Sequence, residues 1–224
     1  MTDLVLITSV INTGTKPWSY SNARSTYTPE QRLEQTLETI QSIRLYLPNA
    51  KIFLVECSDI SQEYTDVLSK KVEYFFNLNE NTMARSACLE TNKKGFGEAV
   101  QTKYAVEYLL EKKIEFRRFF KISGRYSLNE NFHQENYIDT MYTFKRQVRT
   151  GDNQIAISTV IYSVPYQYLH DFYNILGNVI GYYNTHGPKG YEELLPIRCE
   201  PRNEIDIVGV SGYVAVTEND FFTA

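Results

Sequence analysis

The first half of the chain alternates short apolar segments with amphipathic ones, and this alternation limits the fold more than any other feature of the sequence. Four segments have the length and composition of buried strands: residues 4–11, 51–56, 72–77 and 116–122. Continuous apolar runs of this kind are typical of strands covered on both faces. Helical patterns separate them, so the order β-α-β-α-β-α-β predicts a mostly parallel central sheet flanked by helices.

The best-defined helix begins after Thr28, which is a suitable N-cap. Pro29 suits the first helical position, and Gln31 occupies the place of a capping box. Apolar residues then recur at helical spacing, and they are Leu33, Leu37, Ile40, Ile43 and Leu47. Two further helices are predicted over residues 63–70 and 98–112.

The second half of the chain is less regular. We expect a long strand over residues 154–164, a helix over 166–182, a helical turn over 191–195 and closing strands within 205–216. No internal repeat and no clear linker separates the two halves. The sequence therefore predicts one α/β domain over residues 1–224, with a mixed second half.

Charge and cysteine content exclude several classes of function. The formal net charge of −4 provides no basic field for a nucleic-acid backbone, so no nucleic-acid partner is expected. Three widely spaced cysteines without a CxxC pair favour free thiols in a reducing compartment. The N-terminal apolar run is too short for a signal peptide, and no run approaches the ~20 residues of a membrane span. We therefore expect a cytoplasmic protein without a membrane span.

The most informative candidate site follows the strand that ends near residue 122. There Lys121 and Arg125 flank Ser123 and Gly124, so two cations and a small hydroxyl gather at one strand end. In open α/β sheets, ligands bind outside the carboxyl ends of the strands. Lysine and arginine at that place suit a phosphate. The alternative is that Arg125 pairs with a carboxylate and that Gly124 only makes the turn.

A second candidate lies where a helix begins after two lysines. Lys94, Gly95 and Glu98 belong to the run Lys93-Lys94-Gly95-Phe96-Gly97-Glu98, and glycines before a helix let backbone N–H groups approach an anion. The run matches neither a Walker motif nor GxGxxG. A lysine-rich surface turn explains it equally well.

Polar residues also follow the first two strands. The first strand contributes Thr8, Ser9 and Asn12 as candidate substrate-binding residues, and the second contributes Glu56 and Asp59, which suit a ribose hydroxyl or a base N–H. Helix capping and solvated loops account for such residues equally well.

Three more residues complete the candidate set. Arg24 lies between the first strand and its helix, where a nucleotide would bind in a Rossmann-like fold. Glu192 and Glu193 follow a glycine-rich loop, and either carboxylate would serve as a general base. Acidic residues in a first helical turn are also common partners of the helix dipole. No histidine pair has metal-ligand spacing.

Several of these motifs together resemble a known family. They are Ile7-Thr8-Ser9-Val10, Arg24-Ser25, Val55-Glu56-Cys57-Ser58-Asp59, Lys94-Gly95-Phe96-Gly97-Glu98-Ala99 and Phe120-Lys121-Ile122-Ser123-Gly124-Arg125-Tyr126. The pattern, over about residues 3–216, resembles small glycosyltransferase-like proteins of large DNA viruses, phages and some bacteria. These look like nucleotide-sugar transferases of the GT-A (Rossmann-like) fold. A viral origin would imply the host cytoplasm.

The resemblance implies a division of labour along the chain. It implies a nucleotide-sugar donor over about residues 1–126 and a glycan or other hydroxyl acceptor over about 127–224. Within that scheme Lys121, Arg125 and Lys94 would stabilise the departing diphosphate, and Glu193 or Glu192 would deprotonate the acceptor.

The sequence departs from the GT-A pattern at one place. GT-A enzymes usually carry Asp-x-Asp at the strand end that reads Ser123-Gly124-Arg125 here. Either cations replace the metal, which is the reading we favour, or Mn²⁺ or Mg²⁺ is held by acids elsewhere, such as Glu56 or Asp59. No cofactor is certain, and no metal ligand is assigned.

The predicted function is transfer of a sugar from a nucleotide-sugar donor to a hydroxyl. One alternative is a nucleotidyltransferase-like enzyme that uses the glycine-lysine turn on a triphosphate. Another is a non-catalytic carbohydrate-binding module on the same fold, whose tyrosines stack on sugar rings.

Overall fold

A computed structural model describes residues 1–148, 155–185, 190–195, 198–214 and 221–224. The strands in these ranges are β1 (Leu4–Ser9), β2 (Lys51–Glu56), β3 (Tyr74–Asn77), β4 (Arg118–Ser123), β5 (Tyr126–Leu128), β6 (Tyr142–Val148), β7 (Ile155–Pro165), β8 (Arg202–Ile205), β9 (Val210–Tyr213) and β10 (Phe221–Thr223). The helices are α1 (Pro29–Tyr46), α2 (Gln62–Ser69), α3 (Thr82–Leu89), α4 (Lys94–Glu111), α5 (Leu169–Thr185) and α6 (Tyr191–Leu194), with short 3₁₀ turns η1 (Gln134–Asn136) and η2 (Tyr166–Tyr168).

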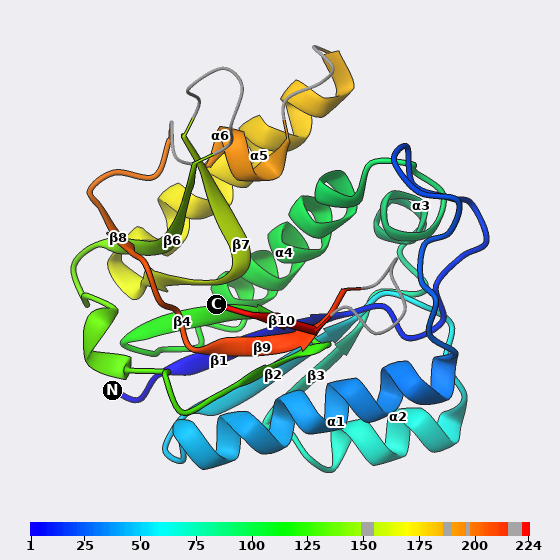
Figure 1. The fold of residues 1–224 in the computed structure, drawn as a ribbon, viewed down its shortest axis with the longest axis horizontal. Coiled ribbons are helices and arrows are strands. Elements are labelled where there is room, and N and C mark those ends of the chain that lie inside the picture. Colours follow the sequence, from blue (N-terminus) through cyan, green and yellow to red (C-terminus); the bar gives the residue numbers. More distant parts are fainter. Residues whose placement is uncertain (149–154, 186–189, 196–197, 215–220) are drawn as a thin grey trace.

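Seven strands form the central sheet in the order β3-β2-β1-β4-β7-β6-β8 (Figure 1). The pairs β3-β2, β2-β1, β1-β4 and β6-β8 are parallel, and β7 is antiparallel to both of its neighbours. A smaller antiparallel sheet has the order β10-β9-β5. The predicted mixed α/β fold with a mostly parallel central sheet is therefore confirmed.

Helices cover both faces of the sheet (Figure 1). Along β1, Leu4 and Leu6 belong to the core on the side of α4 and α5, whereas Val5 and Ile7 belong to the core under α1. All four side chains are buried. The strand is apolar on both faces because each face packs against a helical layer.

Some elements are absent from the sequence-based prediction. Helix α3 is short and carries a weak apolar pattern, although Asn81 caps it by accepting a hydrogen bond from Ala84 N at 2.9 Å. Strand β6 contains Lys145 and Arg146 and becomes a strand through its pairing with β7 and β8. Residue 154 and residues 215–216, which the prediction assigned to strands, lie outside the described residues.

The register of the parallel strands brings their carboxyl ends together. Ser9 pairs with Glu56 of β2, and Thr8 pairs with Ser123 of β4. These three strand ends therefore share one edge, on the right in Figure 1, with the loop that leads from β1 to α1. No helix within the described ranges is long and apolar enough to cross a bilayer.

The N-terminus of α1 supports a stability test. Thr28 Oγ1 accepts a hydrogen bond from Gln31 N, and Gln31 Oε1 accepts one from Thr28 N. Thr28→Ala removes half of this capping box, so we expect a loss of about 1 kcal/mol in the free energy of unfolding. Urea denaturation measures it. Thr65→Ala, inside α2, is the control and should cost nothing, because alanine is the better helix former. Equal losses in both variants would contradict the capping role.

Candidate functional site

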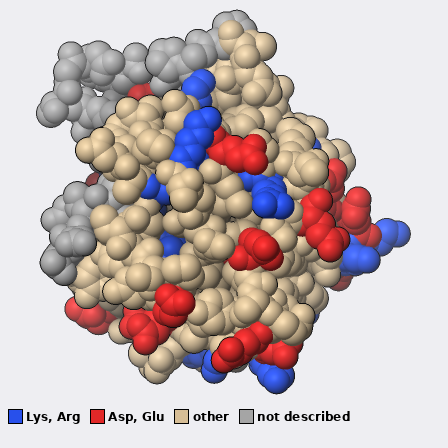
Figure 2. All heavy atoms as spheres, turned by 90° about the vertical axis from the view of Figure 1, so that its right-hand side faces the viewer, with Lys and Arg blue, Asp and Glu red and all other residues tan. Residues whose placement is uncertain are grey.

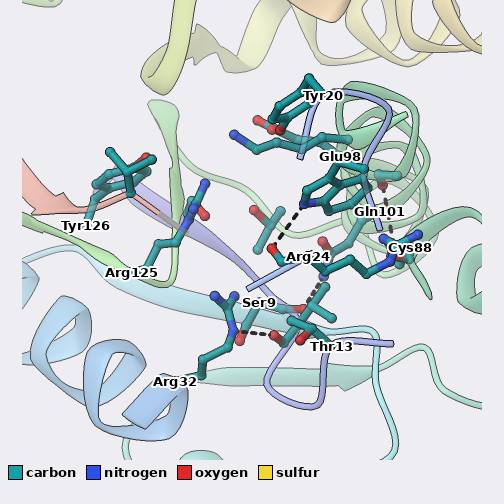
Figure 3. A pocket seen from close by; sticks show the side chains of 17 residues that line it. Ser9, Thr13, Tyr20, Arg24, Arg32, Cys88, Glu98, Gln101, Arg125 and Tyr126 are labelled. Atoms are coloured by element: carbon teal, nitrogen blue, oxygen red, sulfur yellow. Dashed lines mark hydrogen bonds between the residues drawn. The ribbon is translucent and has the colours of Figure 1, made fainter. Parts of the chain in front are cut away.

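A cavity opens at the carboxyl edge of β1 and β4 (Figures 2 and 3). Figure 2 views this edge, where Lys and Arg atoms form a broken column over the upper and central part, and most Asp and Glu atoms lie along the lower and right margins. The residues that line the cavity are Thr8, Ser9, Val10, Thr13, Trp18, Tyr20, Arg24, Arg32, Cys88, Lys94, Gly97, Glu98, Gln101, Ser123, Arg125, Tyr126 and Val214. Seven predicted site residues are among them: Thr8, Ser9, Arg24, Lys94, Glu98, Ser123 and Arg125.

Three cations from different elements meet in this cavity. Arg125 lies in the turn between β4 and β5, Arg32 comes from the first turn of α1, and Lys94 is the first residue of α4. The charge of Arg125 lowers the pKa of Lys94 to about 8, with burial as the next cause. Burial lowers the pKa of Arg32 to about 10, and the charge of Arg125 adds to this effect. Because Arg125 acts on both neighbours, it is the central member of the group.

Within the described part of the chain none of these cations forms an ion pair with a carboxylate, although Glu98 and Glu192 act on Lys94, and Glu56 acts on Arg32, from a longer distance. Arg32 donates from Nε to the carbonyl oxygen of Val10 at 2.7 Å. The guanidinium carbon of Arg125 lies 5.0 Å from the centre of the Tyr126 ring. Arg32 and Arg125 are only 8% and 7% exposed. A buried charge is costly without a counter-ion, so the cavity favours an anionic ligand.

Arg24 holds the wall of the cavity in place. It donates from Nη1 to the carbonyl oxygen of Cys88 at 2.8 Å and from Nη2 to that of Thr91. Its guanidinium carbon lies 3.9 Å from the centre of the Trp18 ring, and Trp18 Nε1 donates to the Arg24 carbonyl oxygen at 3.0 Å. These contacts tie the loop between β1 and α1 to the end of α3.

Lys121 differs from Arg125 because its charge is already matched. Its side chain is fully buried and forms an ion pair with Glu98 of α4. Burial alone would raise the pKa of Glu98, but the nearby charges of Lys121 and Lys94 lower it. Glu98 is therefore ionised at neutral pH, and the pair forms the floor between β4 and α4.

The turn after β4 is held by hydroxyl groups of α1. Thr36 Oγ1 donates to the carbonyl oxygen of Gly124 at 2.9 Å, and Thr39 Oγ1 donates to that of Tyr126 at 2.8 Å. A Cβ atom on Gly124 would lie 3.0 Å from Thr36 Oγ1, so this turn packs closely against the helix. The same contacts place Arg125 beside Arg32 (Figure 3).

Three of the predicted residues, Asn12, Glu56 and Asp59, do not line the cavity. Glu56 Oε1 accepts hydrogen bonds from Ile11 N at 3.1 Å, Ser58 N at 2.8 Å and Ser58 Oγ at 2.5 Å. Asn12 donates from its backbone N to Ser58 Oγ at 2.9 Å and from Nδ2 to the carbonyl oxygen of Asp59 at 3.4 Å. These bonds join the loops after β1 and β2.

Helix α6 carries the two glutamates and packs against the start of α4. A Cβ atom on Gly95 would lie 3.0 Å from Tyr191 Cβ, and Tyr191 Oη lies 2.9 Å from Tyr162 Oη of β7. Glu193 Oε2 accepts a hydrogen bond from Gly190 N at 2.8 Å, so it caps its own helix. The charge of Glu192 acts on Lys94, but neither glutamate lines the cavity.

The residues at this edge do not fit a divalent cation. The place of the usual Asp-x-Asp holds Ser123, Gly124 and Arg125, and cations dominate the cavity lining. In the ranges that the structure describes, no three His, Cys, Asp or Glu side chains gather in a way that would hold a metal ion.

Sequence reasoning missed the other lining residues, among them Arg32, Gln101, Trp18 and Tyr20. The signal for Arg32 was present, because Arg32, Gln35, Thr36 and Thr39 form a polar stripe at helical spacing that is buried. From the sequence alone, a polar stripe on a helix is interpreted as a solvent-exposed face unless the element that packs against it is known.

The Lys121–Glu98 pair supports a test of stability against pH. We expect Lys121→Met to lower the free energy of unfolding by about 3 kcal/mol at neutral pH, because it leaves the Glu98 carboxylate buried without this partner. Glu98 has a lowered pKa in the wild type, so the pair stabilises at neutral pH and loses its effect as the pH falls through that pKa. The deficit of the variant should therefore shrink in acid. Denaturation over a pH series measures it, and a deficit that stays constant would contradict the pairing.

Comparisons with known proteins locate the fold. No protein family model matches the sequence, and no curated protein matches it. Among solved structures, galactosyltransferase LgtC in complex with donor and acceptor sugar analogues has a TM-score of 0.56 at 9% identity, covering 90% of this chain and 72% of that one. Core-mannan synthase A from Aspergillus fumigatus, in its Mn/GDP form, has a TM-score of 0.53 at 8% identity, with coverage of 96% and 75%.

A third solved structure matches nearly end to end. The nucleoside-diphosphate-sugar pyrophosphorylase from Vibrio cholerae has a TM-score of 0.51 at 12% identity, covering 92% of this chain and 93% of that one. At these identities the likeness concerns the fold. The chain has the GT-A type of Rossmann-like α/β fold, with the cationic cavity at the carboxyl edge of its parallel strands.

Proposed function

We propose that the protein transfers a sugar from a nucleotide-sugar donor to a hydroxyl group of a glycan or another acceptor. The observation that carries this proposal is the group of Arg32, Arg125 and Lys94, none of which forms an ion pair with a carboxylate in the described residues. The GT-A fold, shared with two sugar transferases, supports the same reading.

The cation group matches the chemistry of the leaving diphosphate. Breaking the bond between sugar and diphosphate increases the negative charge on the phosphate oxygens. Arg32 and Arg125 are already largely desolvated, so they stabilise that charge without reorganising. Arg125 and Arg32 offer planar groups for bidentate contacts, and Lys94 adds a point charge. We assign this stabilisation to Arg125, Lys94 and Arg32, with Lys121 acting through Glu98 beneath them.

These cations would do the work that a divalent metal does in most GT-A enzymes. Core-mannan synthase A was solved with manganese and GDP, and that manganese belongs to that protein. Here cations line the cavity, and the described residues hold no group of three His, Cys, Asp or Glu side chains that would bind a metal. We therefore propose binding of the diphosphate that does not require a metal.

The acceptor side of the proposal rests on α6. Glu193 caps its helix through Gly190, whereas the charge of Glu192 reaches Lys94. Glu192 is thus the better candidate for the base that deprotonates the acceptor hydroxyl. Residues 1–126 would then bind the donor, and residues 127–224 would bind the acceptor.

A second candidate function is nucleotidyl transfer, which the similarity to the Vibrio cholerae pyrophosphorylase favours. Such an enzyme would release pyrophosphate from a nucleoside triphosphate and a sugar phosphate. A pyrophosphate assay distinguishes the two reactions. For a non-catalytic carbohydrate-binding module, Arg125→Ala would leave glycan binding intact and there would be no turnover to lose.

The intracellular location also remains a proposal. All three cysteines, Cys57, Cys88 and Cys199, are buried free thiols in the described structure. Free thiols fit a reducing compartment such as the cytoplasm. A viral source, which would make this the host cytoplasm, rests on the sequence resemblance alone.

The first test measures nucleotide binding with and without the cations. We expect one of UDP, GDP, CDP and ADP, or its sugar conjugate, to raise the melting temperature in EDTA. Arg125→Gln and Lys94→Met should each weaken that binding roughly tenfold or more, because each removes a charge-assisted contact. Lys93→Met is the matched control, since Lys93 is the neighbouring residue outside the cavity lining, and it should bind as the wild type does. No stabilisation by any nucleotide or nucleotide sugar would sink the proposal.

The second test uses the lowered pKa of Lys94. With a pKa of about 8, Lys94 is about half protonated at pH 8 in the free protein. A bound diphosphate favours the charged form, so binding takes up a proton, and affinity should fall as the pH rises through 8. Calorimetry in buffers of different ionisation enthalpy measures this uptake. Lys94→Met should remove it, and an unchanged uptake in that variant would assign it to another group.

A further inference from the structure

One side of the cavity faces Arg32 and Arg125 across the space (Figure 3). Arg32 and Arg125 lie on one side of the space in Figure 3, and Gln101 lies on the other. Beside Gln101 in Figure 3 lie Cys88, Arg24, whose Nη atoms already donate to backbone carbonyl groups, and Glu98, whose carboxylate is paired with Lys121. If Arg32 and Arg125 hold the diphosphate, the nucleoside part of the donor occupies the side of Gln101.

The orientation of the Gln101 amide is fixed by two hydrogen bonds. Nε2 donates to the carbonyl oxygen of Ser9 at 2.8 Å and to that of Val55 at 2.9 Å. Both partners are acceptors, so the amide nitrogen must face them and its two hydrogens are used. Since the carbonyl groups belong to the adjacent strands β1 and β2, the sheet holds the side chain rigidly.

These bonds leave the amide oxygen of Gln101 as an acceptor for the ligand. Within the described residues the structure shows no hydrogen-bond donor to Oε1, although the side chain is 3% exposed and lines the cavity. A nearly buried acceptor gains from a donor group and loses when a ligand lacks one.

We propose that Gln101 is a specificity-determining residue that accepts a hydrogen bond from an N–H or O–H group of the donor's nucleoside. This inference rests on the proposed function, because it needs the diphosphate to be held by the cations. Two groups of a nucleoside can donate this hydrogen bond: an N–H on the edge of the base and a hydroxyl of the ribose. Sites built to bond a polar ligand group reject analogues without it far more strongly than apolar pockets reject a change of size.

The experiment is a double-mutant cycle between ligand and protein. The probe is the nucleoside diphosphate that binds the wild type best, with three analogues: methylated at the base N–H, 2′-deoxy and 3′-deoxy. We expect one analogue to bind the wild type roughly tenfold more weakly than its parent. In Gln101→Met the same analogue should bind nearly as well as the parent. If the methylated analogue shows this effect, Gln101 bonds the base; if a deoxy analogue shows it, Gln101 bonds the ribose.

A matched control separates this role from a structural one. Gln35 is also a glutamine on a helix and nearly buried, but it does not line the cavity. Gln35→Met should keep the full penalty for the analogue. Because Gln101→Met also loses two bonds to the sheet, a crystal structure of the wild type with the same diphosphate is the second measurement. It should place a ligand N or O within about 3.2 Å of Oε1.

The outcomes separate this inference from the proposed function. If the diphosphate binds and the penalty is the same in wild type and Gln101→Met, Gln101 is not a specificity residue, although the proposed function stands. The same holds if the bound structure shows no ligand donor near Oε1. If no nucleoside diphosphate binds the wild type at all, both proposals are wrong.

Discussion

The candidate site depends on the hydrogen bonds that join α1 to β5 and to the turn before it. Three hydroxyl groups along one face of the helix, those of Thr36, Thr39 and Ser42, bond the backbone of Gly124, Tyr126 and Leu128. Successive hydroxyl groups of the helix are therefore bonded to every second residue from Gly124 to Leu128, and this fixes the position of the helix along β5. This register sets Arg32 of α1 beside Arg125 of the turn, and it keeps two like charges close although they repel each other.

Positive charge is handled in two ways in this region. Lys121 is neutralised by Glu98 and helps to hold α4 against the sheet. Arg125 and Lys94 lie above that pair without a carboxylate of their own among the described residues. The Lys121–Glu98 pair stabilises the folded state, whereas Arg125 and Lys94 remain available to attract an anionic ligand. The difference between the paired Lys121 and Arg125, which forms no ion pair in the described ranges, could not be predicted from the sequence, because both cations flank the same Ser-Gly pair.

Much of the fold could be predicted because its signals are local. The first strand, the capping box of α1 and the strand ends at Ser9, Glu56 and Ser123 all follow from neighbouring residues and from one topological rule. Gln101 and Arg32 could not be assigned, since their partners are carbonyl groups far away in the chain. A polar residue on a helix shows whether it faces solvent or a site only after the helix is placed. Strand β6 was missed for a similar reason, because pairing on both sides makes it a strand in spite of its charges.

The reversal at β7 has a consequence for how the molecule is assembled. Because β7 is antiparallel to β4, it ends at the opposite edge, where Pro165 pairs with Arg118. Helix α5 then returns along the sheet, and the Lys93 side chain meets the carbonyl oxygen of Tyr183 near its end. The start of α4 is thus joined to α5 by a contact between residues ninety positions apart. Contacts so distant in sequence form late and slowly during folding. A ribosome-bound chain that has emerged only as far as β5 carries the cations of the site but lacks α5, which packs against α4.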